Sequence, residues 1–148
     1  MKKVYLIFGR SYLPISVGIQ VITVCRWSHV GLLVGDTVYE ARGGFGVVAT
    51  PLAEFKARYR ETLVRVMYCR NDNVVEDIIS KVGLGYDDKA FWSIAIERLS
   101  RGLLRLDWDD INAYQCAELI AKYSGNFDHA MCHPLVPKDI LRASHAIK

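Results

Sequence analysis

The chain has 148 residues, of which 51% are hydrophobic and 24% are charged, a composition typical of a globular domain and unlike that of disordered or fibrous proteins. Its formal net charge of +3 comes from 19 basic and 16 acidic residues, and no basic run is longer than Lys2-Lys3. This mild, scattered charge gives no support for a nucleic-acid partner. We therefore predict a single domain over residues 1–148 that does not bind nucleic acid.

The N-terminus has some features of a secretory signal, because Lys2-Lys3 precedes the apolar run from Val4 to Phe8. Gly9 and Arg10 end this run after five residues. The apolar region of a signal peptide needs about 7–15 residues, so a buried first strand is the better interpretation. No stretch approaches the roughly 18 apolar residues of a membrane span. We expect a soluble, cytoplasmic protein with no membrane span.

Apolar periodicity and turn residues predict the elements in chain order. The first half is expected to contain a strand over 4–8, a loop over 9–12, a helix over 15–24, paired strands over 28–34 and 37–41, a strand over 47–49 and a helix over 51–59. The second half is expected to contain a strand over 62–69, helices over 72–81, 89–101 and 114–123, and a short helix over 138–143. Mostly antiparallel strands with segregated helices indicate the α+β class.

The predicted hairpin places a histidine and a carboxylate on one face of the sheet. If Gly35 and Asp36 are its two turn residues, His29 and Glu40 are diagonal neighbours, at a separation of about 7–8 Å. A carboxylate there can fix the imidazole tautomer and stabilise the imidazolium. Gly31 lies between them and is expected to leave room above the sheet for a substrate or another helix. A slip of one residue at the turn would separate the two faces.

Among the four cysteines, Cys116 has the setting of a nucleophile. It lies in the first turn of a predicted amphipathic helix, where the positive end of the helix dipole favours the thiolate. Backbone N–H groups in that turn can receive an oxyanion. Cys25, Cys69 and Cys132 lack this setting, and we expect them to be small buried thiols. Position alone leaves a purely structural role open for both Cys116 and His29.

Four stretches, in order along the chain, resemble the motifs of one hydrolase family. They are the hairpin at 27–34 and 38–41, the turn Gly85-Tyr86-Asp87, the segment Tyr114 to Ile120, and the segment Pro134 to Leu141. On these residues the chain resembles the circularly permuted branch of the NlpC-like, papain-fold hydrolases, in which the histidine precedes the cysteine. The sequence departs from that pattern at Ala117, where serine is frequent.

The resemblance implies a permuted papain-like fold, with an antiparallel sheet packed against helices and a cleft between them. It implies that Cys116 is the nucleophile, that His29 is the base and that Glu40 orients the histidine. The implied activity is that of a thiol peptidase or amidase that cleaves an amide bond, possible substrates including cell-wall peptides, through an acyl-enzyme. Hydrolysis of lipid or acyl esters and amides, and acyl transfer, are alternatives on the same fold. No cofactor is expected.

Tyr12, in the loop before the first predicted helix, is a candidate to border the cleft or to donate to the oxyanion. Packing is its alternative role. With Gly31, it completes the set of residues expected near the substrate.

Two other classes of function remain open. A zinc site would use Cys25 with His29, or ligands from the segment 128–133, although neither stretch has a recognised paired spacing. A non-catalytic binding module on the same fold is the second class. The presence of Cys116, His29 and Glu40 together argues against such a module. A bound-metal assay and the reactivity of Cys116 distinguish these alternatives.

Overall fold

The computed structural model describes residues 1–11, 26–42, 45–86, 113–114, 116–127 and 137–147. The predicted helices over 15–24 and 89–101 therefore lie outside the described residues. Within the described part, the elements run in the following order. They are β1 (Lys2–Arg10), β2 (His29–Val34), β3 (Thr37–Arg42), β4 (Gly46–Pro51), α2 (Leu52–Arg58), β5 (Glu61–Cys69), α3 (Val74–Ile79), β6 (Gly85–Tyr86), β7 (Ala113–Tyr114), α5 (Cys116–Ser124), α6 (Pro137–Ala143) and β8 (His145–Ala146).

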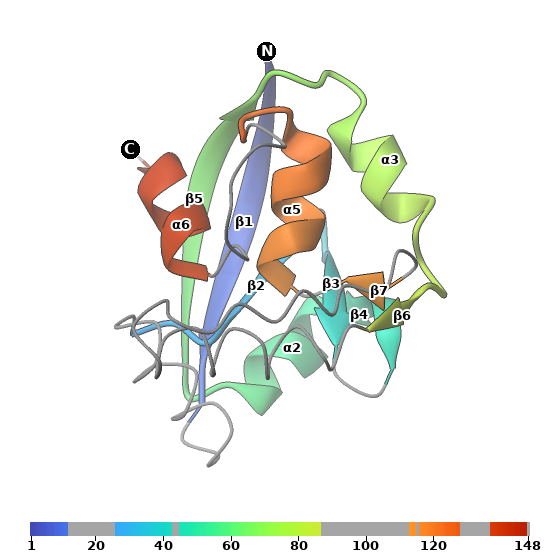
Figure 1. Cartoon of the computed structure of the whole chain (residues 1–148). Coiled ribbons are helices and arrows are strands. Elements are labelled where there is room, and N and C mark those ends of the chain that lie inside the picture. The colour runs from blue at the N-terminus through green and yellow to red at the C-terminus, as the bar shows by residue number, and fades with distance from the viewer. Residues whose placement is uncertain (12–25, 43–44, 87–112, 115, 128–136, 148) are drawn as a thin grey trace, which may run out of the picture.

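The described strands form a six-stranded sheet in the order β4-β3-β2-β1-β5-β8, in which every neighbouring pair is antiparallel. A short pair, β6 with β7, is parallel. With helices on both faces of the larger sheet, the chain belongs to the α+β class (Figure 1). No helix in the described part of the chain is long and apolar enough to cross a membrane.

The predicted hairpin is confirmed in its register. Leu32 pairs with Tyr39 and Val34 pairs with Thr37, which leaves Gly35 and Asp36 as the turn. Gly35 has a φ of 57°, a left-handed conformation that glycine adopts without steric cost. A two-residue turn of this kind matches the twist of the flanking strands.

Two predicted boundaries were wrong because they depend on pairing partners distant in sequence. Gly9 and Arg10 were expected in a loop, but they belong to β1, which pairs with β5 as far as Arg10 and Glu61. The helix expected from residue 114 begins at Cys116 instead. Ala113 and Tyr114 form β7, aligned with β6. Cys116 is therefore the first residue of its helix.

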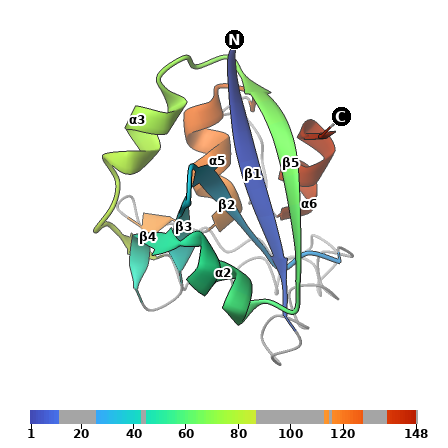
Figure 2. The same ribbon diagram turned by 180° about the vertical axis from the view of Figure 1, so that it is seen from behind.

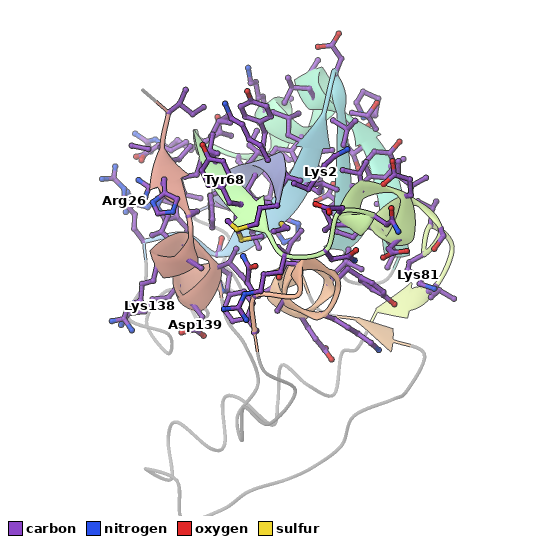
Figure 3. The ribbon with its side chains drawn as sticks, turned by 90° about the horizontal axis from the view of Figure 1, so that it is seen from above. Lys2, Arg26, Tyr68, Lys81, Lys138 and Asp139 are labelled. Atoms are coloured by element: carbon purple, nitrogen blue, oxygen red, sulfur yellow. The ribbon has the colours of Figure 1, made fainter. Side chains whose placement is uncertain are left out.

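The two faces of the sheet are covered unequally. On one face lies α5, flanked by α3 and α6, and on the other lies α2 (Figures 1 and 2). The larger core lies between the sheet and α5, and its fully buried side chains include Leu6, Phe8, Leu32, Met67, Leu119, Ile120 and Ile140. The smaller core lies under α2 and consists of Ile7, Val38 and Phe55. Seen from above, side chains fill the space around the sheet, and Arg26, Lys81 and Lys138 lie at the periphery (Figure 3).

The position of β1 explains why its sequence does not alternate between apolar and polar residues. β1 is an inner strand, paired with β2 on one side and β5 on the other. Leu6 and Phe8 are buried in the larger core, whereas Ile7 between them is buried in the smaller one. A strand covered on both faces reads as a continuous apolar run.

We predict that Phe8→Ala lowers the free energy of unfolding by about 3–5 kcal/mol, because it leaves a cavity between β1 and α5. Tyr5→Ala is the matched control in the same strand, since Tyr5 is 41% exposed and Phe8 is 0% exposed. We expect Tyr5→Ala to cost less than about 1 kcal/mol. Urea denaturation of both variants measures the difference. Equal losses would contradict the assignment of Phe8 to the core.

Candidate active site

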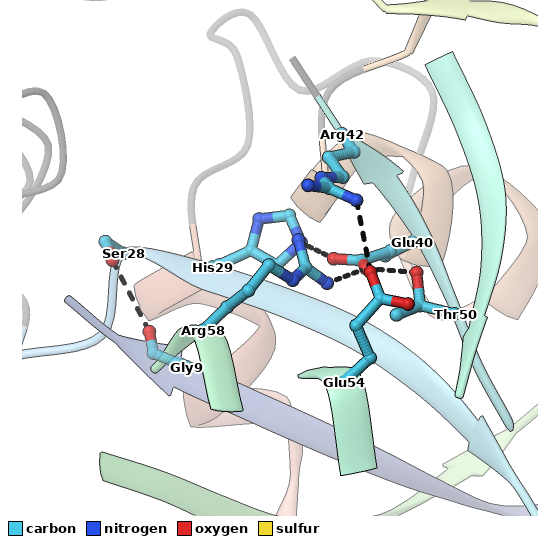
Figure 4. A network of polar contacts seen from close by, with 8 residues as sticks. All are labelled: Gly9, Ser28, His29, Glu40, Arg42, Thr50, Glu54 and Arg58. Atoms are coloured by element: carbon cyan, nitrogen blue, oxygen red, sulfur yellow. Dashed lines mark hydrogen bonds and ion pairs between the residues drawn. The ribbon is translucent and has the colours of Figure 1, made fainter. Parts of the chain in front are cut away.

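His29 and Glu40 meet at the end of the sheet where β2 begins. Nε2 of His29 lies 2.7 Å from Oε2 of Glu40 (Figure 4). The hairpin register places both residues on the same face of the sheet, and their side chains approach each other across it. The His29 side chain is 12% exposed and the Glu40 side chain is 0% exposed. The structure therefore brings the predicted base and its predicted orienting residue into direct contact.

Three donors surround the buried carboxylate of Glu40. Besides the contact with His29, the hydroxyl of Thr50 on β4 donates to Oε1 at 2.6 Å, and Nη2 of Arg58 at the end of α2 donates to the same oxygen. Burial alone would raise the pKa of Glu40, but the hydrogen bond and charge of His29, the Thr50 hydroxyl and the Arg58 charge lower it to about 2. Glu40 is therefore a buried anion with a charged or polar partner on each oxygen.

Cys116 completes a chain of contacts through His29. It is the first residue of α5 and is buried. Burial alone would lower the pKa of His29, but the charge of Cys116, a hydrogen bond with Cys116 and the contact with Glu40 together raise it to about 9. The structure thus joins all three predicted catalytic residues, with the imidazole in the middle.

An aromatic ring covers one side of the imidazole. The rings of His29 and Tyr59 are stacked, with centroids 5.7 Å apart and planes inclined by 13°. Gly9 provides the room, because a Cβ atom there would lie 2.7 Å from Cγ of Tyr59. Phe55 in α2 lies beside both rings, and its ring centroid is 6.1 Å from that of His29 and 4.8 Å from that of Tyr59. Burial, together with the charge of Glu40, raises the pKa of Tyr59, so its hydroxyl remains neutral.

Three residues of this network were missed in the sequence analysis. Thr50, Arg58 and Tyr59 reach Glu40 and His29 from β4 and from the end of α2. Their place depends on the pairing of β4 with β3 and on how α2 packs on the back of the sheet. The pattern of residues in the hairpin carries no information about that packing. An arginine and a tyrosine at the end of the helix that follows β4 are the available signal.

The space above Gly31 is filled by protein. A Cβ atom at Gly31 would lie 2.6 Å from Cγ1 of Val38, 3.1 Å from the carbonyl oxygen of Tyr39 and 3.4 Å from Cβ of Glu40. Gly31 is itself buried. The room expected at Gly31 for a substrate or another helix is taken, at the position of a Cβ atom, by β3 and its side chains.

The remaining site predictions fall largely outside the described residues. Tyr12 lies there, as do Cys25 and the segment 128–133 of the alternative zinc site. Within the described part of the chain, no group of three or more histidine, cysteine or acidic side chains is arranged to hold a metal ion. Cys69 and Cys116 are free thiols, and burial raises the pKa of Cys69 to about 11.

Comparisons with known proteins assign no family to the chain. No protein-family model and no curated protein matches the sequence. A solved structure described as the metalloprotein yiiX from Escherichia coli O157:H7, DUF1105, is similar to it with 24% sequence identity and a TM-score of 0.47. The match covers 82% of this chain and 63% of that one, so this chain spans less than two thirds of the length of that structure. A likeness of this degree assigns no activity.

We predict that Gly31→Ala destabilises the protein by about 1–3 kcal/mol, because the new methyl group overlaps Val38 and the backbone of β3. Gly35→Ala is a useful comparison, because nothing lies within 4 Å of a Cβ there and only the positive φ opposes the change. An unchanged free energy of unfolding for Gly31→Ala in urea denaturation would show that β2 and β3 leave room for a methyl group at Gly31.

The shifted pKa values predict how much Glu40 contributes to stability at each pH. Its folded-state pKa of about 2 lies below the ordinary value of 4.5, so its contribution is present above pH 4.5 and is lost as the pH falls towards 2. The folded-state pKa of His29, about 9, lies above the ordinary 6.5, so its contribution is present below pH 6.5 and is lost as the pH rises through 9. Both contributions are fully present between pH 4.5 and pH 6.5. We therefore expect Glu40→Gln to lower the free energy of unfolding most in this range, by about 3–5 kcal/mol.

Urea denaturation of the wild type and of Glu40→Gln from pH 3 to pH 9 measures this difference. Glu54→Gln is the matched control, because Glu54 is 55% exposed and its nearest guanidinium nitrogen, on Arg42, is 3.6 Å away. That variant should cost less than about 1 kcal/mol at every pH. A Glu40→Gln loss that does not shrink at low pH would show that the carboxylate is not charged in the folded protein.

Proposed function

We propose that this protein is a cysteine-nucleophile hydrolase that cleaves an amide bond, with Cys116 as nucleophile, His29 as base and Glu40 as the residue that orients the histidine. The supporting observation is the position of His29, which contacts Cys116 on one side and Glu40 on the other. A nucleophile, a base and a group that orients the base are the parts that covalent catalysis of acyl transfer requires.

The proposed mechanism begins with an ion pair. In the proposed pair, Cys116 has given its proton to His29, whose pKa of about 9 keeps the imidazole protonated at neutral pH. The thiolate attacks the carbonyl carbon, and backbone N–H groups at the start of α5 donate to the oxyanion. His29 then gives its proton to the leaving amine, and a thioester remains on Cys116. Water, deprotonated by His29, then attacks the thioester, which releases the acid and restores the Cys116 thiolate beside the protonated His29. Glu40 holds Nε2 throughout.

We also propose the permuted papain-like fold for the chain. In that branch the histidine strand precedes the cysteine helix in the sequence, and here β2 with His29 precedes α5 with Cys116. The proposed substrate is a peptide or another acyl amide, and cell-wall peptides are a candidate class. Attack by the same thiolate on an acyl or lipid ester, and transfer of the acyl group to an acceptor other than water, are the alternatives that a substrate screen distinguishes.

The first test is alkylation of the native protein with iodoacetamide from pH 5 to pH 9, resolved for each cysteine by mass spectrometry. We expect Cys116 to react fastest and to remain reactive well below pH 8, because His29 stabilises its thiolate. Cys69, whose pKa burial raises to about 11, is the internal reference. His29→Ala should slow Cys116 and leave Cys69 unchanged. A Cys116 that reacts no faster than Cys69 would overturn the proposal and favour a binding module.

The same variants test turnover once a substrate is found. Cys116→Ala should abolish it while the thermal unfolding curve stays cooperative. His29→Ala should lower kcat by about 10²–10⁴-fold, the range typical of a lost general base. Glu40→Gln should reduce kcat less, because the base itself remains. Cys69→Ala is the control and should keep its activity, because Cys69 pairs with Lys2 at the end of β1 opposite to Gly9, the partner of His29.

A further inference from the structure

Arg58 is the last residue of α2 and reaches from the back of the sheet to the buried carboxylate of Glu40. Its Nη2 donates to Oε1 of Glu40, and its guanidinium lies over two aromatic rings, 5.4 Å from the centroid of Phe55 and 5.5 Å from that of Tyr59. Tyr59 is the residue stacked on His29. Arg58 therefore contacts both groups that flank the imidazole of His29, the carboxylate of Glu40 and the ring of Tyr59.

The donors are divided between the two oxygens of Glu40. Oε1 accepts from Thr50 and from Arg58, whereas Oε2 faces Nε2 of His29 (Figure 4). Rotating the carboxylate would break both contacts on Oε1. The groups on Oε1 therefore fix the plane in which the carboxylate meets the imidazole, and they come from β4 and α2 rather than from the hairpin itself.

The guanidinium is placed by its contact with Glu40 rather than by saturation of its own donors. Nε of Arg58 is buried and has no hydrogen-bond partner among the described residues. A buried donor without a partner is unfavourable. The conformation is retained although that donor is unpaired, which points to the contact of Nη2 with Oε1 and the two ring contacts as what fixes the side chain.

We propose that Arg58 is a positioning residue of the site, which holds the carboxylate of Glu40 so that Oε2 meets Nε2 of His29. The inference rests on the proposed function, because a catalytic effect of Arg58 requires that His29 acts on Cys116. A planar guanidinium suits this role better than an ammonium, since it can lie flat on the rings of Phe55 and Tyr59 while it donates to a carboxylate.

The charge of Arg58 also acts on the ionisation of Glu40. The groups facing Glu40 are His29 on β2, Thr50 on β4 and Arg58 on α2. Arg42, two residues further along β3, pairs with Glu54 instead. The charge of Arg58 contributes to the lowered pKa of Glu40. Removing the charge of Arg58 should raise the pKa of Glu40, although the substitution changes neither the Cys116 nor the His29 side chain.

The experiment compares Arg58→Met with Arg42→Met. Methionine keeps an unbranched apolar stem and removes the guanidinium, and Arg42 supplies a second guanidinium on the same face of the sheet that does not contact Glu40. Two quantities are measured in the folded proteins. The first is the titration of the Glu40 carboxyl carbon by NMR, and the second is the alkylation rate of Cys116 from pH 5 to pH 9.

For Arg58→Met we expect the titration of Glu40 to move up by about 1–3 pH units and Cys116 alkylation near pH 6 to slow several-fold. Arg42→Met should change neither. Arg58→Lys should restore most of the Glu40 titration but only part of the alkylation rate, because its ammonium restores the charge and not the planar contacts. If Arg58→Met does not fold, Arg58→Lys is the deciding variant. An alkylation rate of Cys116 in Arg58→Lys equal to that of the wild type would overturn the proposal.

The two readouts separate this inference from the proposed function. If Arg58 only holds α2 in place, Arg58→Met lowers the melting temperature while Glu40 titrates as in the wild type, and the inference fails. If Cys116 is unreactive in the wild type, the proposed hydrolase fails and the catalytic part of the inference with it, whereas a shifted Glu40 titration still identifies Arg58 as the residue that fixes the carboxylate.

Discussion

The burial of a single ionised carboxylate, that of Glu40, imposes the main constraint on the site. A carboxylate with no exposed surface is stable only when its oxygens are paired, and the donors come from three different elements: His29 from β2, Thr50 from β4 and Arg58 from α2. The hairpin, the next strand and the helix on the back of the sheet must therefore all be in place before Glu40 can be buried. Folding of this end of the sheet and assembly of the site are the same event.

The two cores support different residues of the site. The larger core lies under α5 and includes Cys116 at the start of that helix. The smaller core under α2 contains Ile7, Val38 and Phe55, and it ends at the aromatic and charged groups around His29. Its role is to bring the end of α2 to the carboxylate. One face of the sheet supports the nucleophile and the other supports the base.

The sequence was sufficient for the parts of the site that depend on local geometry. The two-residue turn at Gly35 and Asp36 fixed the hairpin register, and the register placed His29 and Glu40 on one face. The parts that depend on contacts between distant segments were missed. Thr50, Arg58 and Tyr59 required knowledge of how α2 returns to the sheet. The contacts around Gly31 could not be predicted without knowing how β3 packs beside it. The strand β7 could not be predicted because its partner, β6, is distant in sequence.

The β4 strand has a second attachment besides the one to Glu40. The amide of Val47 on β4 donates to the carbonyl of Leu84 at 2.7 Å, and the amide of Gly83 donates to the carbonyl of Val47 at 2.8 Å. Leu84 leads directly into β6, which pairs with β7, and β7 ends two residues before Cys116. The strand β4 therefore carries Thr50, which donates to Glu40. It also forms hydrogen bonds with the segment that leads into β6, the partner of β7. The strand that supplies a donor to the base side of the site is therefore also the strand that anchors the segment leading towards the nucleophile.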